Sequence, residues 1–204
     1  MLSKLRDGVG RLFAPLARGL LRIGVSPDAV TITGTLGVVV AALWLFPLGH
    51  LFAGTMVCWF FAMSDALDGL MARMSGRTGP WGAFLDSTLD RLADAAVFTG
   101  ILLWLAGRGE DPVGATLALA CLILGSIVPY ARARAEGLGM TANVGIAERA
   151  ERLTLVLTAA GLVGIGVNPA LLTVVLGVLA VASAITIVQR MATVRRQSLR
   201  VVEE

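Results

Sequence analysis

The sequence predicts an all-α integral membrane protein, in which six transmembrane helices follow one amphipathic helix that lies in the membrane interface. Three observations indicate this class. Of the 204 residues, 56% are hydrophobic and 15% are charged, and the mean hydropathy of +0.81 is far above that of a soluble domain. The apolar residues gather in stretches of about 20 residues, the length that a bilayer-crossing helix needs. The basic residues fall mainly in every second connection between these stretches.

The first 22 residues are expected to form the interfacial helix (1–22), and residues 23–204 the membrane domain. Apolar residues recur in the first segment at helical spacing with basic residues between them, a pattern typical of a helix that lies flat in the headgroup region. Because this segment lacks an uninterrupted apolar core, no cleavable signal peptide is predicted. We expect the helix to anchor and orient the chain.

Six apolar stretches follow, and each is predicted to cross the membrane as a helix. They are Ala29–Gly49, Leu51–Met74, Phe84–Ala106, Val113–Ala133, Leu153–Val167 and Ala170–Gln189. The fifth stretch is short, so its helix is expected to begin earlier, over residues 148–152, in a water-filled cavity.

The charges in the connections predict the orientation of the chain. Basic residues precede the first stretch and follow the second, fourth and sixth, whereas the opposite side carries only Arg108, beside Glu110 and Asp111. This bias places both termini in the cytoplasm and the protein in the cell membrane. The net charge of +3 then forms a one-sided basic face for anionic lipids or an anionic substrate, so no nucleic-acid partner is expected.

The cysteines and the single histidine carry no chemistry in this interpretation. Cys58 and Cys121 lie within apolar stretches and are expected to be small core residues, with neither a disulfide nor a metal site. His50 lies at the end of a stretch and is expected to be interfacial.

Four aspartates interrupt the second and third stretches. Asp65 and Asp68 belong to one helix, and Asp86 and Asp90 to the next, so each spacing puts two carboxylates on one helix face. A carboxylate at membrane depth is costly and indicates a functional site. Hard oxygen ligands suit divalent cations such as Mg²⁺, with Mn²⁺ as a possible substitute, and two such ions would balance the four negative charges. A pair of metal ions promotes phosphoryl transfer.

Small and basic residues flank these aspartates. Gly69 and Gly82 lack a Cβ, which lets a bulky ligand approach the backbone, and Arg73 is suited to bind a phosphate. Asp94 continues the face of residues 86–90 by one turn, and we expect it to support the metal ligands rather than to bind a metal.

Three interpretations of the aspartates compete: an ion-pair network with arginines, the cation pathway of a transporter, and the metal site of an enzyme. The pattern D-x-x-D-G-x-x-A-R-x8-G-x3-D-x3-D, which runs from Asp65 to Asp90, favours the enzyme. It resembles the motif of the CDP-alcohol phosphotransferases, membrane enzymes that join a CDP-activated lipid or alcohol to an acceptor hydroxyl and release CMP. The predicted six spans and cytoplasmic termini are similar to that family over nearly the whole chain.

The resemblance implies roles for individual residues. Asp65, Asp68 and Asp86 would bind the first of two Mg²⁺ ions, and Asp65, Asp86 and Asp90 the second. Asp90 would also be the general base that accepts the proton of the acceptor hydroxyl. The site for CDP-diacylglycerol would comprise Asp28, Ala29, Val30, Thr31, Gly69, Arg73, Gly79 and Gly82. The family also implies a homodimer.

The segment that enters the first stretch has a second interpretation. Residues 26–31 are equally typical of a helix start, with Ser26 as its cap and Pro27 in the first turn. Both interpretations can hold together.

Arginines near the cytoplasmic ends of the last three stretches predict a phosphorylated acceptor. Residues 130–139 and 143–152 contain four arginines and three glutamates, and arginine forks suit a phosphate dianion. These segments resemble the bacterial phosphatidylinositol-phosphate synthases of the same family, whose acceptor is an inositol phosphate, 1D-myo-inositol 3-phosphate. That likeness implies an acceptor-phosphate site formed by Arg134, Arg152 and an arginine after the sixth stretch, Arg195 or Arg190. Glycerol 3-phosphate is the alternative acceptor, and salt bridges in basic loops are the alternative role of each arginine.

Overall fold

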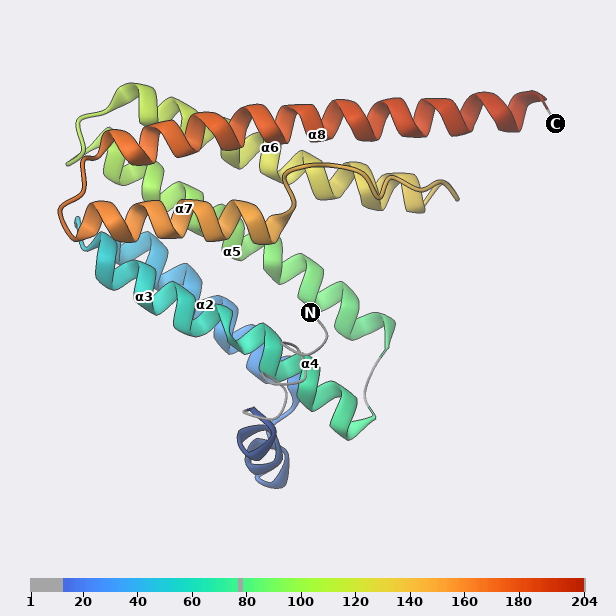
Figure 1. Cartoon of the computed structure of the whole chain (residues 1–204). Coiled ribbons are helices and arrows are strands. Elements are labelled where there is room, and N and C mark those ends of the chain that lie inside the picture. Colours follow the sequence, from blue (N-terminus) through green and yellow to red (C-terminus); the bar gives the residue numbers. More distant parts are fainter. Residues whose placement is uncertain (1–12, 77–78, 204) are drawn as a thin grey trace.

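The computed structural model describes residues 13–76 and 79–203, apart from the side chains of residues 65, 66 and 200–203. Over these residues the regular secondary structure consists of helices alone (Figure 1). A first helix covers residues 13–22. It is followed by α2 (Pro27–Leu45), α3 (Leu51–Ala62), α4 (Ser64–Ser75), α5 (Pro80–Ala106), α6 (Pro112–Glu136), α7 (Arg149–Gly164) and α8 (Ala170–Glu203).

Four segments of the described chain are long and apolar enough to cross a membrane: Pro27–Leu45, Leu51–Ser75, Pro112–Glu136 and Ala170–Leu199. The other two helices predicted to span differ from these for physical reasons. Helix α5 has 27 residues but carries several charges in its first half, and α7 has 16 residues. The structure therefore supports a membrane protein with several long apolar helices.

Local sequence determines where the helices start and stop. The Ser26 side chain caps α2 by accepting a hydrogen bond from Ala29 N at 3.1 Å, as expected of a helix start. The second predicted stretch divides into α3 and α4 at Met63. At this break Ser64 Oγ donates to the carbonyl of Phe61 at 2.6 Å, so a side chain competes with the backbone for an acceptor.

Helices α2, α3, α5, α6, α7 and α8 share one apolar core, in which Cys58 and Cys121 are both buried, as predicted. Glycines allow close approach between helices. A Cβ on Gly164 of α7 would overlap the backbone of Phe52 in α3, and a Cβ on Gly37 of α2 would overlap the ring of Phe61.

The helix of residues 13–22 belongs to a second, smaller apolar cluster. Ala17 of this helix and Met71 of α4 are fully buried there, together with Leu67. Figure 1 shows this helix in dark blue below the start of α2 and near α4, away from the turn that joins α7 to α8. Residues 1–12, the first part of the predicted amphipathic helix, lie outside the described residues.

Candidate active site

Helices α4 and α5 carry the four predicted metal-binding aspartates. Asp68 of α4 is buried, with 7% of its surface exposed, and its Oδ2 accepts a hydrogen bond from Thr31 Oγ1 at 2.6 Å. Asp86 and Asp90 lie one turn apart on α5. Asp65 lies in α4, and its side chain is outside the described residues. Among the described side chains there is no group of three metal-ligating residues.

A cavity of about 310 Å³ lies between the start of α2, helix α4 and the start of α5. It is lined by Pro27, Asp28, Thr31, Asp68, Gly69, Ala72, Arg73, Gly79, Gly82, Ala83 and Asp86. Six of the eight residues predicted to bind CDP-diacylglycerol are therefore brought together with two of the predicted metal ligands. The other two are not in this lining, because Ala29 is exposed and Val30 packs against the small cluster around Met71.

The glycines of this cavity leave space beside the backbone. Among the described atoms, a Cβ on Gly79 or Gly82 would meet nothing within 4 Å, and a Cβ on Gly69 would meet only Arg73 Nη1, at 3.6 Å. Packing against the described residues does not require glycine at these positions. Room for a bound group is a better explanation of them.

Trp81 at the start of α5 is a further residue at this site, which sequence reasoning did not find. Its indole Nε1 donates to Asp28 Oδ2 at 2.9 Å and so links the beginnings of α2 and α5. Its ring also packs beside that of Phe84, with centroids 6.0 Å apart. The only signal in the sequence was the pair of aromatic residues next to the glycines of the motif.

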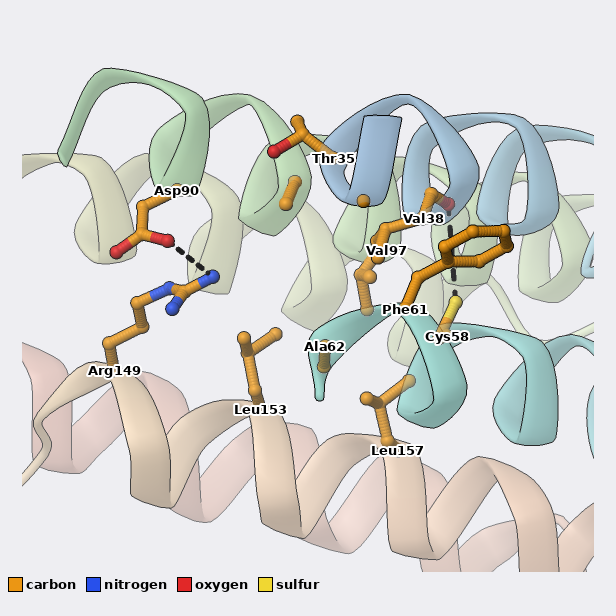
Figure 2. A pocket seen from close by; sticks show the side chains of 12 residues that line it. Thr35, Val38, Cys58, Phe61, Ala62, Asp90, Val97, Arg149, Leu153 and Leu157 are labelled. Carbon is orange, nitrogen blue, oxygen red and sulfur yellow. Dashed lines mark hydrogen bonds and ion pairs between the residues drawn. The ribbon is translucent and has the colours of Figure 1, made fainter. Parts of the chain in front are cut away.

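Asp90 faces a second, smaller cavity of about 20 Å³, lined also by Arg149. Figure 2 shows the two side chains pointing toward each other, with Leu153 and Thr35 near them. Arg149 Nη2 lies 2.9 Å from Asp90 Oδ1, and Arg91 Nη2 lies 3.7 Å from Asp90 Oδ2. Sequence reasoning assigned no role to Arg149, because its approach to α5 depends on how α7 packs.

Asp94, one turn beyond Asp90, is buried and bound by two arginines. Its Oδ1 accepts from Arg149 Nε at 2.9 Å, and its Oδ2 accepts from Arg152 Nη2 at 3.3 Å. Since both oxygens are engaged, Asp94 is better placed to support its neighbours than to bind a metal.

The four arginines predicted to bind the acceptor phosphate do not share one site. Arg134, Arg190 and Arg195 line a groove of about 560 Å³ between the C-terminal parts of α6 and α8. Arg134 and Arg195 are exposed, whereas Arg190 is buried and its Nε donates to the carbonyl of Val144 at 2.9 Å. Arg152 lies apart from this groove. It is 1% exposed and packs against Gly125 of α6.

Comparison with known proteins finds a matching family model and similar curated proteins. The CDP-alcohol phosphatidyltransferase family model matches residues 24–188. The phosphatidylinositol phosphate synthase of Streptomyces avermitilis is 48% identical over 195 residues, which cover 92% of this chain and 80% of that protein. The corresponding protein of Cutibacterium acnes is 47% identical over 203 residues, covering 96% of this chain and 98% of that protein.

Solved structures of a mycobacterial relative have the same fold. The phosphatidylinositol phosphate synthase of Mycobacterium tuberculosis with CDP-DAG bound matches with a TM-score of 0.87 and 48% identity, covering 90% of this chain and 94% of that chain. The same protein in complex with manganese and citrate matches with a TM-score of 0.86, covering 89% and 88%.

Proposed function

This chain belongs to the CDP-alcohol phosphatidyltransferase family, and we propose that it transfers the phosphatidyl group of CDP-diacylglycerol to a hydroxyl of 1D-myo-inositol 3-phosphate. The products are phosphatidylinositol phosphate and CMP. One observation carries this proposal: a single cavity gathers Asp68 and Asp86 with six residues of the proposed CDP-diacylglycerol site. Support for the substrate comes from the mycobacterial relative of 48% identity, which was solved with CDP-DAG bound.

The donor set of the site fits a divalent cation. Aspartate oxygens are hard ligands of the kind that Mg²⁺ and Mn²⁺ prefer, and the relative was also solved with manganese. We assign Asp65, Asp68 and Asp86 to one Mg²⁺ and Asp65, Asp86 and Asp90 to a second. The ions, when bound, supply positive charge that polarises the phosphoryl oxygens and stabilises the departing CMP.

The residues of the chain orient the substrates and move one proton. Arg73 lies in the cavity beside Gly69, where its guanidinium is suited to hold a phosphate of the CDP group. The acceptor oxygen bonds to the phosphorus that carries the diacylglycerol, and the bond from this phosphorus to the CMP oxygen breaks. Asp90 accepts the proton of the attacking hydroxyl as the new bond forms.

Arginines supply the acceptor site in this proposal. The acceptor phosphate needs cationic partners because it must lie near the negative pyrophosphate. Arg134 and Arg195, with Arg190 behind them, line one groove, so these three can contact one bound anion. Arg152 keeps its predicted role only if it exchanges its contact with Asp94, at 3.3 Å, for the acceptor.

The proposed enzyme lies in the cell membrane as a homodimer, with six spans in residues 23–204 and an interfacial helix in residues 1–22. Its active site and both termini face the cytoplasm. Two features support this arrangement: the one-sided distribution of basic residues and the packing of residues 13–22 against α4.

Metal dependence tests the proposal. Purified protein with CDP-diacylglycerol and inositol phosphate is expected to release CMP, EDTA to abolish the release, and Mg²⁺ or Mn²⁺ to restore it. Asp86→Asn is expected to be among the most damaging single changes, because Asp86 is assigned to both ions. Near-normal turnover of this variant would contradict the two-metal assignment.

A further inference from the structure

We propose that Arg149 is a positioning residue that fixes the carboxylate of Asp90 for the transfer reaction. This inference rests on the proposed function and extends it to a residue on α7. The guanidinium of Arg149 contacts two carboxylates of α5 at once. Its Nη2 lies 2.9 Å from Asp90 Oδ1, and its Nε lies 2.9 Å from Asp94 Oδ1.

The two contacts define the direction in which Asp90 points. The N–H groups of a guanidinium are fixed in one plane, so an arginine held at one edge has little freedom at the other. Asp90 and Asp94 are four residues apart and therefore lie on one face of α5. Arg149 contacts both residues of this face (Figure 2 shows its contact with Asp90). Its contact with Asp94 therefore fixes the position of the guanidinium group that binds Asp90.

The contact behind Asp94 is buried. Its second oxygen accepts from Arg152 Nη2 at 3.3 Å, and Arg152 is 1% exposed. Arg152 packs against Gly125 of α6, where a Cβ would lie 3.6 Å from the guanidinium carbon. A row of ion pairs therefore extends from the reaction centre into the packed core, through Asp90, Arg149, Asp94 and Arg152 in turn.

The backbone that carries Arg149 is also held in place. Arg149 is the first residue of α7, and the residues before it are hydrogen-bonded to α8. Thr186 Oγ1 accepts from Ile146 N at 3.1 Å and from Ala147 N at 3.2 Å. Asp90 lies on α5, but its side chain is thus held through contacts that also involve α6, α7 and α8.

If Arg149 acted only through its positive charge, its substitution by lysine would have a different effect on turnover than if it positions Asp90. A lysine at position 149 would keep the positive charge but could not form the fork, since its ammonium is a single point charge on a flexible stem. Arg149→Lys and Arg149→Gln therefore separate the two explanations. Arg132→Gln is the matched control, because Arg132 also lies 2.9 Å from a carboxylate, that of Glu136, but on the exposed surface.

The experiment uses the full-length protein in detergent and measures CMP release, thermal unfolding and Mn²⁺ affinity. For both Arg149 variants we expect kcat to fall about 10- to 100-fold, with the KM for CDP-diacylglycerol changed less than about twofold. Mn²⁺ affinity is expected to stay unchanged in Arg149→Lys and to rise in Arg149→Gln, because a positive charge near the metal site is lost. Arg132→Gln is expected to match the wild type.

A double mutant tests whether Asp94 acts through Arg149. If it does, Arg149→Gln combined with Asp94→Asn should lower kcat no further than the more damaging single change. The inference is overturned if Arg149→Lys restores turnover, if the two effects are additive, or if Tm and Mn²⁺ affinity fall together with kcat. A wild-type protein that releases no CMP would instead refute the proposed function, so the two failures are distinguishable.

Discussion

Replacing Thr31 with valine removes one defined contact of a proposed metal ligand. The Thr31 hydroxyl donates to Asp68 Oδ2 at 2.6 Å, and Asp68 is only 7% exposed, so little water is available to replace the lost donor. A hydrogen bond to a charged group contributes about 1.5–3 kcal/mol. At about 1.4 kcal/mol for each factor of ten, the expected loss in kcat/KM for CDP-diacylglycerol is about 10- to 100-fold.

The same helix provides the control for this change. Thr33 Oγ1 donates to the carbonyl of Ala29 at 2.7 Å, and Thr33 is not among the residues that line the cavity. Thr33→Val therefore makes the same chemical change without touching Asp68, and we expect its activity to remain within about twofold of the wild type. Thr31→Ser keeps the hydroxyl and is expected to recover most of the activity.

The assay is CMP release at varied CDP-diacylglycerol concentration, with Tm measured in parallel. Wild-type kcat/KM in Thr31→Val would refute the claim that Thr31 orients Asp68. Equal losses in Thr31→Val and Thr33→Val would also refute it, because the effect would then belong to the helix and not to the contact.

Three further changes test other parts of the structure. Arg134→Gln is expected to raise the KM for inositol phosphate about 10- to 100-fold while the KM for CDP-diacylglycerol stays constant in the CMP-release assay. Gly100→Ala places a methyl group against the carbonyl of Ala42 and is expected to cost about 1–3 kcal/mol, seen as a lower Tm in detergent. The backbone N–H of Gly114 holds the pKa of Asp111 below its ordinary value of 3.8, so Asp111 stabilises the fold above pH 3.8 and loses this effect as the pH falls from 3.8 through the lower pKa of the folded state. Asp111→Asn is expected to remove this part of the pH dependence of Tm.

The aspartate motif contains several of the residues that line the larger cavity. Asp68 and Asp86 line one cavity with Gly69 and Arg73, because the motif fixes which helix faces carry polar residues. The cap at Ser26 and the core positions of the cysteines also followed from local sequence. These features are determined by residues close by in the sequence or by the tendency of apolar residues to be buried.

Features that depend on packing between distant helices could not be predicted. The contact of Arg149 with Asp90 joins residues on α7 and α5, and no local pattern distinguishes this arginine from Arg152. The burial of Arg152 against Gly125 likewise depends on how α6 meets α7. Periodicity also did not reveal the break at Met63, because residues 59–68 contain neither the glycine nor the proline that usually interrupts a helix.

The identity of the acceptor tests the central claim most directly. Purified protein is given CDP-diacylglycerol, Mg²⁺ and one acceptor at a time: inositol phosphate, glycerol 3-phosphate, free inositol or serine. Mass spectrometry identifies the lipid product, and released CMP gives the rate. We predict rapid formation of phosphatidylinositol phosphate with inositol phosphate and little product with the others. Preference for glycerol 3-phosphate would contradict the acceptor assignment. Absence of CMP release with every acceptor, together with cation transport in liposomes, would contradict the enzyme itself.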